Sequence, residues 1–130
     1  MSVGVVLVTH DDVGEVILKA AVSALDMCPL PVEVLAVTRG DSPEAMVARA
    51  QELVEKVSQG DGVLVITDIY GSTPSNIASA LQQSMEVKAI AGLNLPMLIK
   101  VFNYPKLNLD DLLSKALDGG REGIMRCEAR

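Results

Sequence analysis

Residues 3–12 read Val3-Gly4-Val5-Val6-Leu7-Val8-Thr9-His10-Asp11-Asp12. The first six residues form a short apolar run rich in β-branched side chains, which is typical of a strand buried on both faces. The polar residues that follow are expected to end this strand, and Asp12 with Glu15 three residues later predicts a capped helix start. His10, the single histidine of the chain, therefore lies where α/β folds place their ligands.

Strand-like and helix-like segments alternate along the rest of the chain. Apolar runs predict strands at residues 32–37, 63–67 and 87–91. Amphipathic segments predict helices at 12–26, 43–57 and 73–85, a shorter helix after 94, a helix from 108 to 118, and a short last strand at 122–126. The first helix is expected to bury Val16, Ile17, Ala20, Ala21, Ala24 and Leu25. This order predicts one α/β domain over residues 1–130, with a mainly parallel four-stranded sheet covered by helices on both faces.

Composition narrows the classes of function. The chain has 130 residues and a net charge of −6, which argues against nucleic acid and anionic membranes as partners. No run of 18 apolar residues is present and no basic leader precedes the first strand, so we expect a cytoplasmic protein without a membrane span. Cys28 and Cys127 show no metal-ligand spacing and are expected to be free thiols. With one histidine in the chain, neither a metal site nor a cofactor is expected.

A second polar loop, residues 67–76, follows the third predicted strand. In a sheet of order 2-1-3-4 the first and third strands are neighbours, so His10 and Asp68 are expected side by side. They would lie at the topological switch point, where the helices that follow the two strands leave on opposite faces of the sheet. Asp68 would accept a hydrogen bond from one ring nitrogen and leave the other nitrogen free as a nucleophile.

The same loop leads into a predicted helix. Backbone N–H groups over Gly71–Thr73, with the hydroxyls of Ser72 and Thr73, are expected to form an anion-binding site at the helix start. Pro74 fits the first helical turn because no N–H is needed there. A nucleophilic histidine, an orienting carboxylate and an anion site together favour phosphoryl transfer through phosphohistidine.

Four segments carry a resemblance to a known family: the strand ending in Thr9-His10, Thr67–Asn76, Ala91–Leu98, and Gly120–Gly123. Over essentially its whole length the chain resembles the enzyme IIA components of the mannose-type sugar phosphotransferase system (PTS). The resemblance implies that the phosphocarrier HPr phosphorylates His10, which passes the group to a IIB partner and through it to membrane transporter subunits. It also implies that Asp68 orients His10, that Thr73 helps hold the phosphoryl group, and that a homodimer exchanges the strand at 122–126. Because the chain ends at Arg130, we expect IIB to be a separate protein.

Two other functions are open at this point. A regulator would carry the same phosphohistidine and use it to control binding to another protein instead of transport. A receiver-type domain would bind magnesium through Asp11, Asp12 and Asp68 and be phosphorylated on aspartate, although it would leave His10 without a purpose. The sequence does not name a sugar. Arg39 is expected to be a solvated loop residue, and Tyr70 an exposed residue that packs on a partner.

Overall fold

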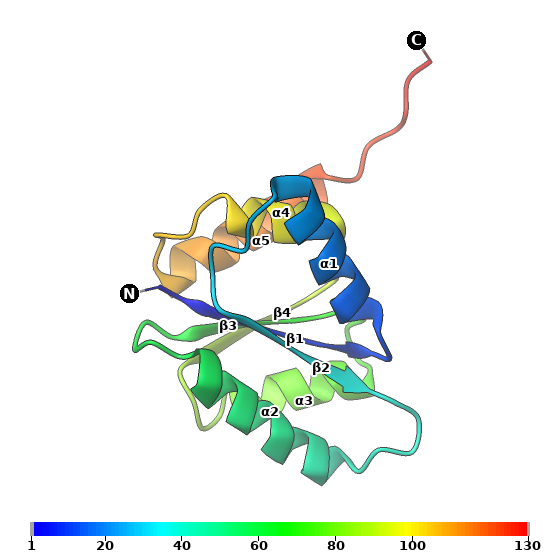
Figure 1. Ribbon diagram of the computed structural model, residues 1–130. Coiled ribbons are helices and arrows are strands. Elements are labelled where there is room, and N and C mark those ends of the chain that lie inside the picture. Colours follow the sequence, from blue (N-terminus) through cyan, green and yellow to red (C-terminus); the bar gives the residue numbers. More distant parts are fainter. Residues whose placement is uncertain (1, 130) are drawn as a thin grey trace.

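The computed structural model describes residues 2–129 and has an α/β architecture (Figure 1). The elements in chain order are β1 (Gly4–His10), α1 (Val13–Leu25), β2 (Val32–Val37), α2 (Pro43–Val57), β3 (Val63–Thr67), α3 (Thr73–Leu81), β4 (Val87–Ala91), α4 (Leu95–Phe102) and α5 (Leu109–Glu122). The four strands are parallel and lie in the order β2-β1-β3-β4, which confirms the predicted sheet. Strand β1 continues through His10, beyond the predicted end at residue 8, because its backbone still pairs with β2 there.

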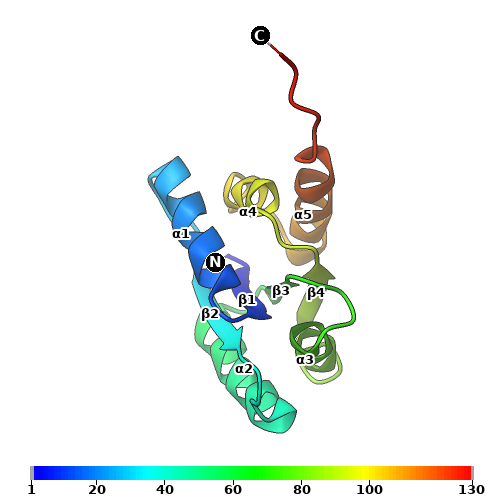
Figure 2. The ribbon, with the colours of Figure 1, turned by 90° about the vertical axis from the view of Figure 1, so that its right-hand side faces the viewer.

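Helices cover both faces of the sheet, as predicted. Helices α1, α4 and α5 lie on one face, and α2 and α3 lie on the other (Figure 2). Each face of the sheet has its own hydrophobic core. Successive residues of β1 point to opposite faces, so Val5 and Leu7 lie in the core beneath α1, α4 and α5, and Val6 and Val8 lie in the core beneath α2 and α3. Both cores are almost entirely aliphatic, which accounts for a stable sheet in a chain with one Phe and two Tyr.

Helix α1 is anchored by Thr9 and rotated relative to its predicted face. Gly14 N–H donates to the buried Thr9 Oγ1 at 2.8 Å, whereas the side chain of Asp12 makes no capping hydrogen bond. The helix buries Gly14 and Ala21, and Val16, predicted to be inside, is 58% exposed. The turn at Gly14 passes so close to Thr9 that a Cβ there would lie 3.0 Å from its Oγ1, and this approach sets the helix rotation.

Helices α4 and α5 pack through glycines that were predicted to end a helix. Gly119 and Gly120 lie inside α5, which runs to Glu122. Both are buried against α4, and a Cβ on Gly120 would lie 2.8 Å from Met97 Cε. The side chain of Asn94 also donates to Gly120 O at 3.1 Å. Close packing of the two helices therefore outweighs the low helix propensity of glycine.

Two further boundaries differ from the sequence prediction. Helix α3, predicted to reach Met85, ends at Leu81. The strand predicted at 122–126 is absent from the described part of the chain: α5 takes Glu122, and residues 124–129 have no regular structure and extend away from the body (Figure 1). A strand needs a neighbour that accepts and donates its backbone hydrogen bonds, and this segment pairs with no strand among residues 2–129.

Candidate active site

His10 is the last residue of β1 and lies at the carboxyl edge of the sheet. Its backbone pairs with Val37 of β2, and the following residue, Asp11, donates its N–H to Val37 O at 3.0 Å. Thr9 before it is fully buried, while the side chain of His10 is 43% exposed. A buried strand thus holds the backbone of a histidine whose ring is accessible from solvent.

Asp68 lies beside His10, as the predicted strand order requires. It follows β3, whose last residue, Thr67, pairs with Val8 of β1. Asp68 Oδ2 accepts two hydrogen bonds from His10, one from Nδ1 and one from the backbone N–H, each at 2.9 Å. The other oxygen, Oδ1, accepts from Ile69 N–H at 3.0 Å. The carboxylate is therefore fixed by one ring contact and two backbone contacts.

The electrostatics of this pair favour the ionised carboxylate. The side chain of Asp68 is only 10% exposed, and this burial raises the pKa of its carboxyl. The hydrogen bonds from His10 and Ile69, with the attraction of the His10 ring, outweigh burial and hold the pKa below its ordinary value of 3.8. An ionised carboxylate can only accept, so Nδ1 carries a proton and a neutral His10 has its lone pair on Nε2. The arrangement therefore presents a ring nitrogen suited to nucleophilic attack.

The loop between Asp68 and α3 holds itself in place. Gly71 has a φ of +84°, in the left-handed region that favours glycine, and its N–H donates to the buried Ser75 Oγ at 3.2 Å. Ser72 is the N-cap of α3: its hydroxyl donates to Ile69 O at 2.6 Å and accepts from Ser75 N–H at 3.4 Å. The Gly71 N–H and the Ser72 hydroxyl thus already have partners, in the first turn of α3 and in the loop respectively. The structural role of Ser75 was not predicted, although a serine three residues after an N-cap serine is a local signal for it.

A cavity of about 430 Å³ opens beside the ring of His10. Its lining includes His10 and Asp11 from the end of β1, the turn Thr38–Asp41 after β2, and Thr73 at the start of α3. Of the three residues predicted to bind an anion, Thr73 is the one that lines this cavity with His10, whereas Gly71 and Ser72 are not among its lining residues. The positive end of the α3 dipole adds to the suitability of this position for a negatively charged group.

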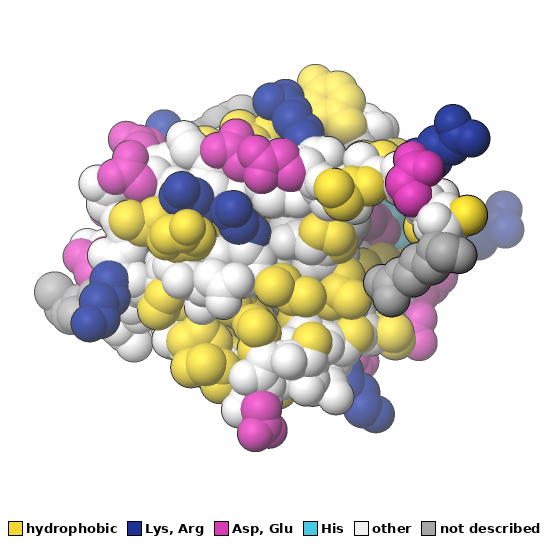
Figure 3. All heavy atoms as spheres, turned by 90° about the horizontal axis from the view of Figure 1, so that it is seen from above, with side chains coloured by type: hydrophobic (Ala, Val, Ile, Leu, Met, Phe, Trp, Pro, Cys, Tyr) yellow, Lys and Arg dark blue, Asp and Glu magenta, His cyan; other side chains and the backbone are white. Residues whose placement is uncertain are grey.

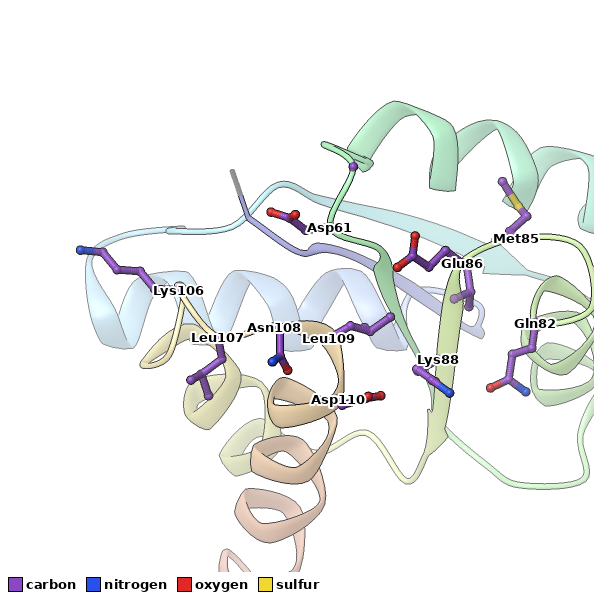
Figure 4. A pocket seen from close by; sticks show the side chains of 12 residues that line it. Asp61, Gln82, Met85, Glu86, Lys88, Lys106, Leu107, Asn108, Leu109 and Asp110 are labelled. Carbon is purple, nitrogen blue, oxygen red and sulfur yellow. The ribbon is translucent and has the colours of Figure 1, made fainter.

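A larger cavity, of about 720 Å³, lies at the opposite edge of the sheet (Figure 4). It is lined by residues before β3, at the start of β4 and at the start of α5, including Asp61, Glu86, Lys88 and Asp110. Because all strands are parallel, the amino ends that surround this cavity lie a full strand length from the carboxyl end that carries His10. No histidine lines this cavity, so it is a poor candidate for phosphohistidine chemistry.

Neither a metal site nor a membrane span emerges from residues 2–129. Nowhere in this range do three or more His, Cys, Asp or Glu side chains come together in a way that could hold a metal ion. No helix within it is both long and apolar enough to cross a bilayer. Cys28 and Cys127 are free and exposed.

Comparison with known proteins identifies the family. The model of the family EIIA-man, described as the PTS system fructose IIA component, matches residues 4–117. The mannose-specific EIIAB component of Escherichia coli K12 is 29% identical over 100% of this chain, which spans 41% of that protein. The fructose-specific EIIA component of Bacillus subtilis is 25% identical over 68% of this chain and 62% of its own length.

Solved structures share the fold. The mannose/sorbose-specific IIA subunit from Enterococcus faecalis superposes with a TM-score of 0.89 at 21% identity, covering 100% of this chain and 98% of that one. The EIIA component from Streptococcus agalactiae has a TM-score of 0.82 at 26% identity, covering 95% and 96%. With the family match spanning β1 through most of α5, the chain belongs to the EIIA-man family of the sugar phosphotransferase system.

Proposed function

We propose that this chain is a phosphoryl carrier that accepts a phosphoryl group from HPr on His10 and passes it to a separate IIB protein. The observation that carries the proposal is the 2.9 Å contact between His10 Nδ1 and Asp68 Oδ2, which leaves Nε2 as the ring nitrogen without this partner. His10 also lines the cavity of about 430 Å³. In the accepting step Nε2 attacks phosphorus, a P–N bond forms, and the donor leaves with the electron pair of the bond that breaks. The reverse process, with IIB as the attacking nucleophile, releases the group.

The neighbouring residues have distinct proposed roles. As the P–N bond forms, the imidazole ring becomes positively charged, and the Asp68 carboxylate stabilises it through Nδ1–H. Thr73 and the amino end of α3 stabilise the incoming phosphoryl oxygens. Gly71 and Ser72 hold the loop that brings Thr73 to the cavity. No metal ion and no cofactor takes part in this scheme.

A protein donor and a protein acceptor both require an accessible surface around His10. Large apolar side chains are exposed on the segments that flank the pair: Val13 (37%) and Val16 (58%) follow His10, and Ile69 (61%) and Tyr70 (87%) follow Asp68. Exposed apolar groups at this spacing support a protein-docking surface, and the exposure of Tyr70 fits its expected packing on a partner. We propose that HPr and IIB use this surface in turn, and that IIB connects the chain to membrane transporter subunits.

We also propose a homodimer in which residues 122–126 pair with the partner subunit. Within the described residues β3 is the one strand that pairs with β4. The outer edge of β4 can accept another strand if the Ala89 N–H, which donates to Gln82 Oε1 at 2.9 Å, is released. The terminal segment carries Ile124 and Met125, which are 79% and 80% exposed. Hydrophobic side chains also gather in the middle of the face formed by α1, α4 and α5 (Figure 3).

The exposed thiols bear on where the chain works. We propose that the chain works as one IIA domain in the cytoplasm, where its two free, exposed thiols would remain reduced.

A regulatory role would use the same phosphohistidine, and transfer onward through IIB to a sugar distinguishes transport from regulation. The receiver-type alternative receives no support, because both oxygens of Asp68 already accept hydrogen bonds from His10 and Ile69.

The proposal is tested by incubating the chain with phosphoenolpyruvate, enzyme I and HPr. We expect an acid-labile, base-stable phosphate that is absent from His10→Ala. A phosphate labile in both acid and base would instead indicate a carboxylate, and label retained by His10→Ala would refute the phosphohistidine. Light scattering tests the dimer, which a monomer at every concentration would contradict.

A further inference from the structure

We propose that Arg39 contacts the phosphoryl group on His10 and is a phosphate-binding residue of this chain, an inference that rests on the proposed function. Arg39 lines the same cavity of about 430 Å³ as His10 and Thr73. It reaches the cavity from β2, whereas Asp68 and Thr73 reach the site from β3 and α3. A phosphoryl group on Nε2 would therefore have Thr73 on one side and a guanidinium on the other.

The backbone holds Arg39 close to His10. Val37, the register partner of His10, accepts a hydrogen bond from Asp11 N–H at 3.0 Å, so β2 ends directly beside the histidine. The side chain of Arg39 starts two residues beyond this point. Because the extended arginine side chain is longer than the spacing of neighbouring strands, its guanidinium can reach the ring side of the cavity without any movement of the sheet.

The turn that carries Arg39 is locked by Asp41. Asp41 Oδ2 accepts from Thr38 N–H at 2.8 Å and from Thr38 Oγ1 at 3.0 Å, and Asp41 N–H donates back to Thr38 O at 3.1 Å. Gly40 has a φ of +94°, which lets the chain reverse with little strain. These contacts fix the backbone at Arg39 and leave its side chain exposed.

The charges around the cavity favour phosphate binding by Arg39. Among residues 2–129 the ion pairs are His10–Asp68, Arg49–Glu52 and Lys56–Glu33, so Arg39 has no carboxylate partner. Of the residues that line the cavity, Arg39 is the one with a permanent positive charge, and two others, Asp11 and Asp41, are acidic. A phosphoryl group there would meet these negative charges unless a cation offset them. The planar guanidinium suits this task because it donates two parallel hydrogen bonds to phosphate oxygens.

In the transfer step Arg39 stays protonated and moves no proton. The P–N bond to Nε2 forms and the donor's bond to phosphorus breaks, while the guanidinium neutralises charge on the oxygens that are not transferred. The same contact persists in phosphorylated His10. Arg39 should therefore affect both the rate at which His10 is labelled and the lifetime of the label against hydrolysis.

The test compares Arg39→Gln and Arg39→Lys with Arg49→Gln, which removes one positive charge from the exposed face of α2. Each variant is labelled by two donors: HPr, regenerated by phosphoenolpyruvate and enzyme I, and phosphoramidate, a small donor that needs no docking surface. For Arg39→Gln we expect labelling about tenfold slower with both donors, as for the loss of one charge-assisted hydrogen bond at a partly exposed site. Arg39→Lys should fall in between, and Arg49→Gln should match the parent chain.

The outcomes separate this inference from the proposed function. If the parent chain is labelled on His10 and Arg39→Gln is labelled equally fast with equal lifetime, the role of Arg39 is refuted and the carrier function stands. Slowing with HPr but not with phosphoramidate would also refute it, because Arg39 would then act in docking. If neither donor labels His10 in the parent chain, the proposed function fails and the inference falls with it. Equal melting temperatures of all variants exclude misfolding as the cause of a slower rate.

Discussion

Replacing Asp68 by Asn tests the orientation of His10 with the smallest possible change in shape. The carboxylate accepts from His10 through Oδ2 and from Ile69 N–H through Oδ1. An amide has one oxygen and one NH₂ group, so it cannot accept at both positions. If the oxygen faces Ile69, the NH₂ group faces His10 Nδ1, which must then accept, and the ring proton moves to Nε2. That tautomer has no lone pair at the attacking position.

The magnitude follows from the hydrogen bond that is lost. If the amide oxygen faces His10 instead, the Nδ1 contact survives without the negative charge, and the NH₂ group faces the Ile69 N–H. In either orientation the ring loses a charge-assisted hydrogen bond, worth about 1.5–3 kcal/mol. At about 1.4 kcal/mol for each factor of ten, phosphorylation should slow by about 10- to 150-fold. Asp68→Ala removes every acceptor, including that of His10 N–H, and should be slower still and about 1–2 kcal/mol less stable.

Rapid-quench labelling with limiting HPr measures this rate, and urea unfolding measures the stability of each variant. Asp118→Asn is the matched control, because Asp118 is an exposed residue of α5 far along the chain from the site. It should leave both quantities unchanged. Labelling of Asp68→Asn at the parent rate, with a folded protein, would refute the orienting role of the carboxylate.

Three further perturbations test the packing and electrostatics. Thr9→Val leaves Gly14 N–H without its 2.8 Å acceptor at the start of α1, and should lower the free energy of unfolding in urea by about 1–2 kcal/mol; an unchanged midpoint would contradict the capping role. Gly4→Ala places a Cβ 2.5 Å from Val57 O, which should cost about 3 kcal/mol in the same assay, and a loss below experimental error would show that the contact relaxes freely. The lowered pKa of Asp68 contributes stability that is present above its unfolded value of 3.8 and is lost as the pH falls through the folded-state pKa. As the pH falls below 3.8 the parent chain should therefore lose more stability than Asp68→Asn in urea unfolding series, and the same pH dependence for both proteins would contradict this.

Sequence patterns predicted the strands and the central pair well. The ranges predicted for the later strands coincide with β2, β3 and β4, because each is a short apolar run between polar breaks. The adjacency of His10 and Asp68 followed from the strand order, since neighbouring parallel strands bring their carboxyl ends together. Both depend on local pattern and topology, and one sequence contains that information.

Those sequence patterns could not predict contacts between segments that lie far apart in the chain. Gly119 and Gly120 looked like a helix end because glycine has low helix propensity, yet the close approach of α4 keeps them inside α5. Thr9 looked like a residue of a strand end, and its capping of α1 depends on where the helix turns over the sheet. Arg39 looked like a solvated residue, and only the pairing of Val37 with His10 places it at the cavity.

The sequence by itself determined the parallel sheet, the helices on both faces and the pairing of His10 with Asp68, because these features follow from hydrophobic periodicity and the order of elements along the chain. The tertiary structure decided which helix face is buried, which hydroxyl caps α1, and which loop residues open onto the ring of His10. These features depend on distances between segments that are far apart in the chain, and such distances are set only when the helices pack on the sheet.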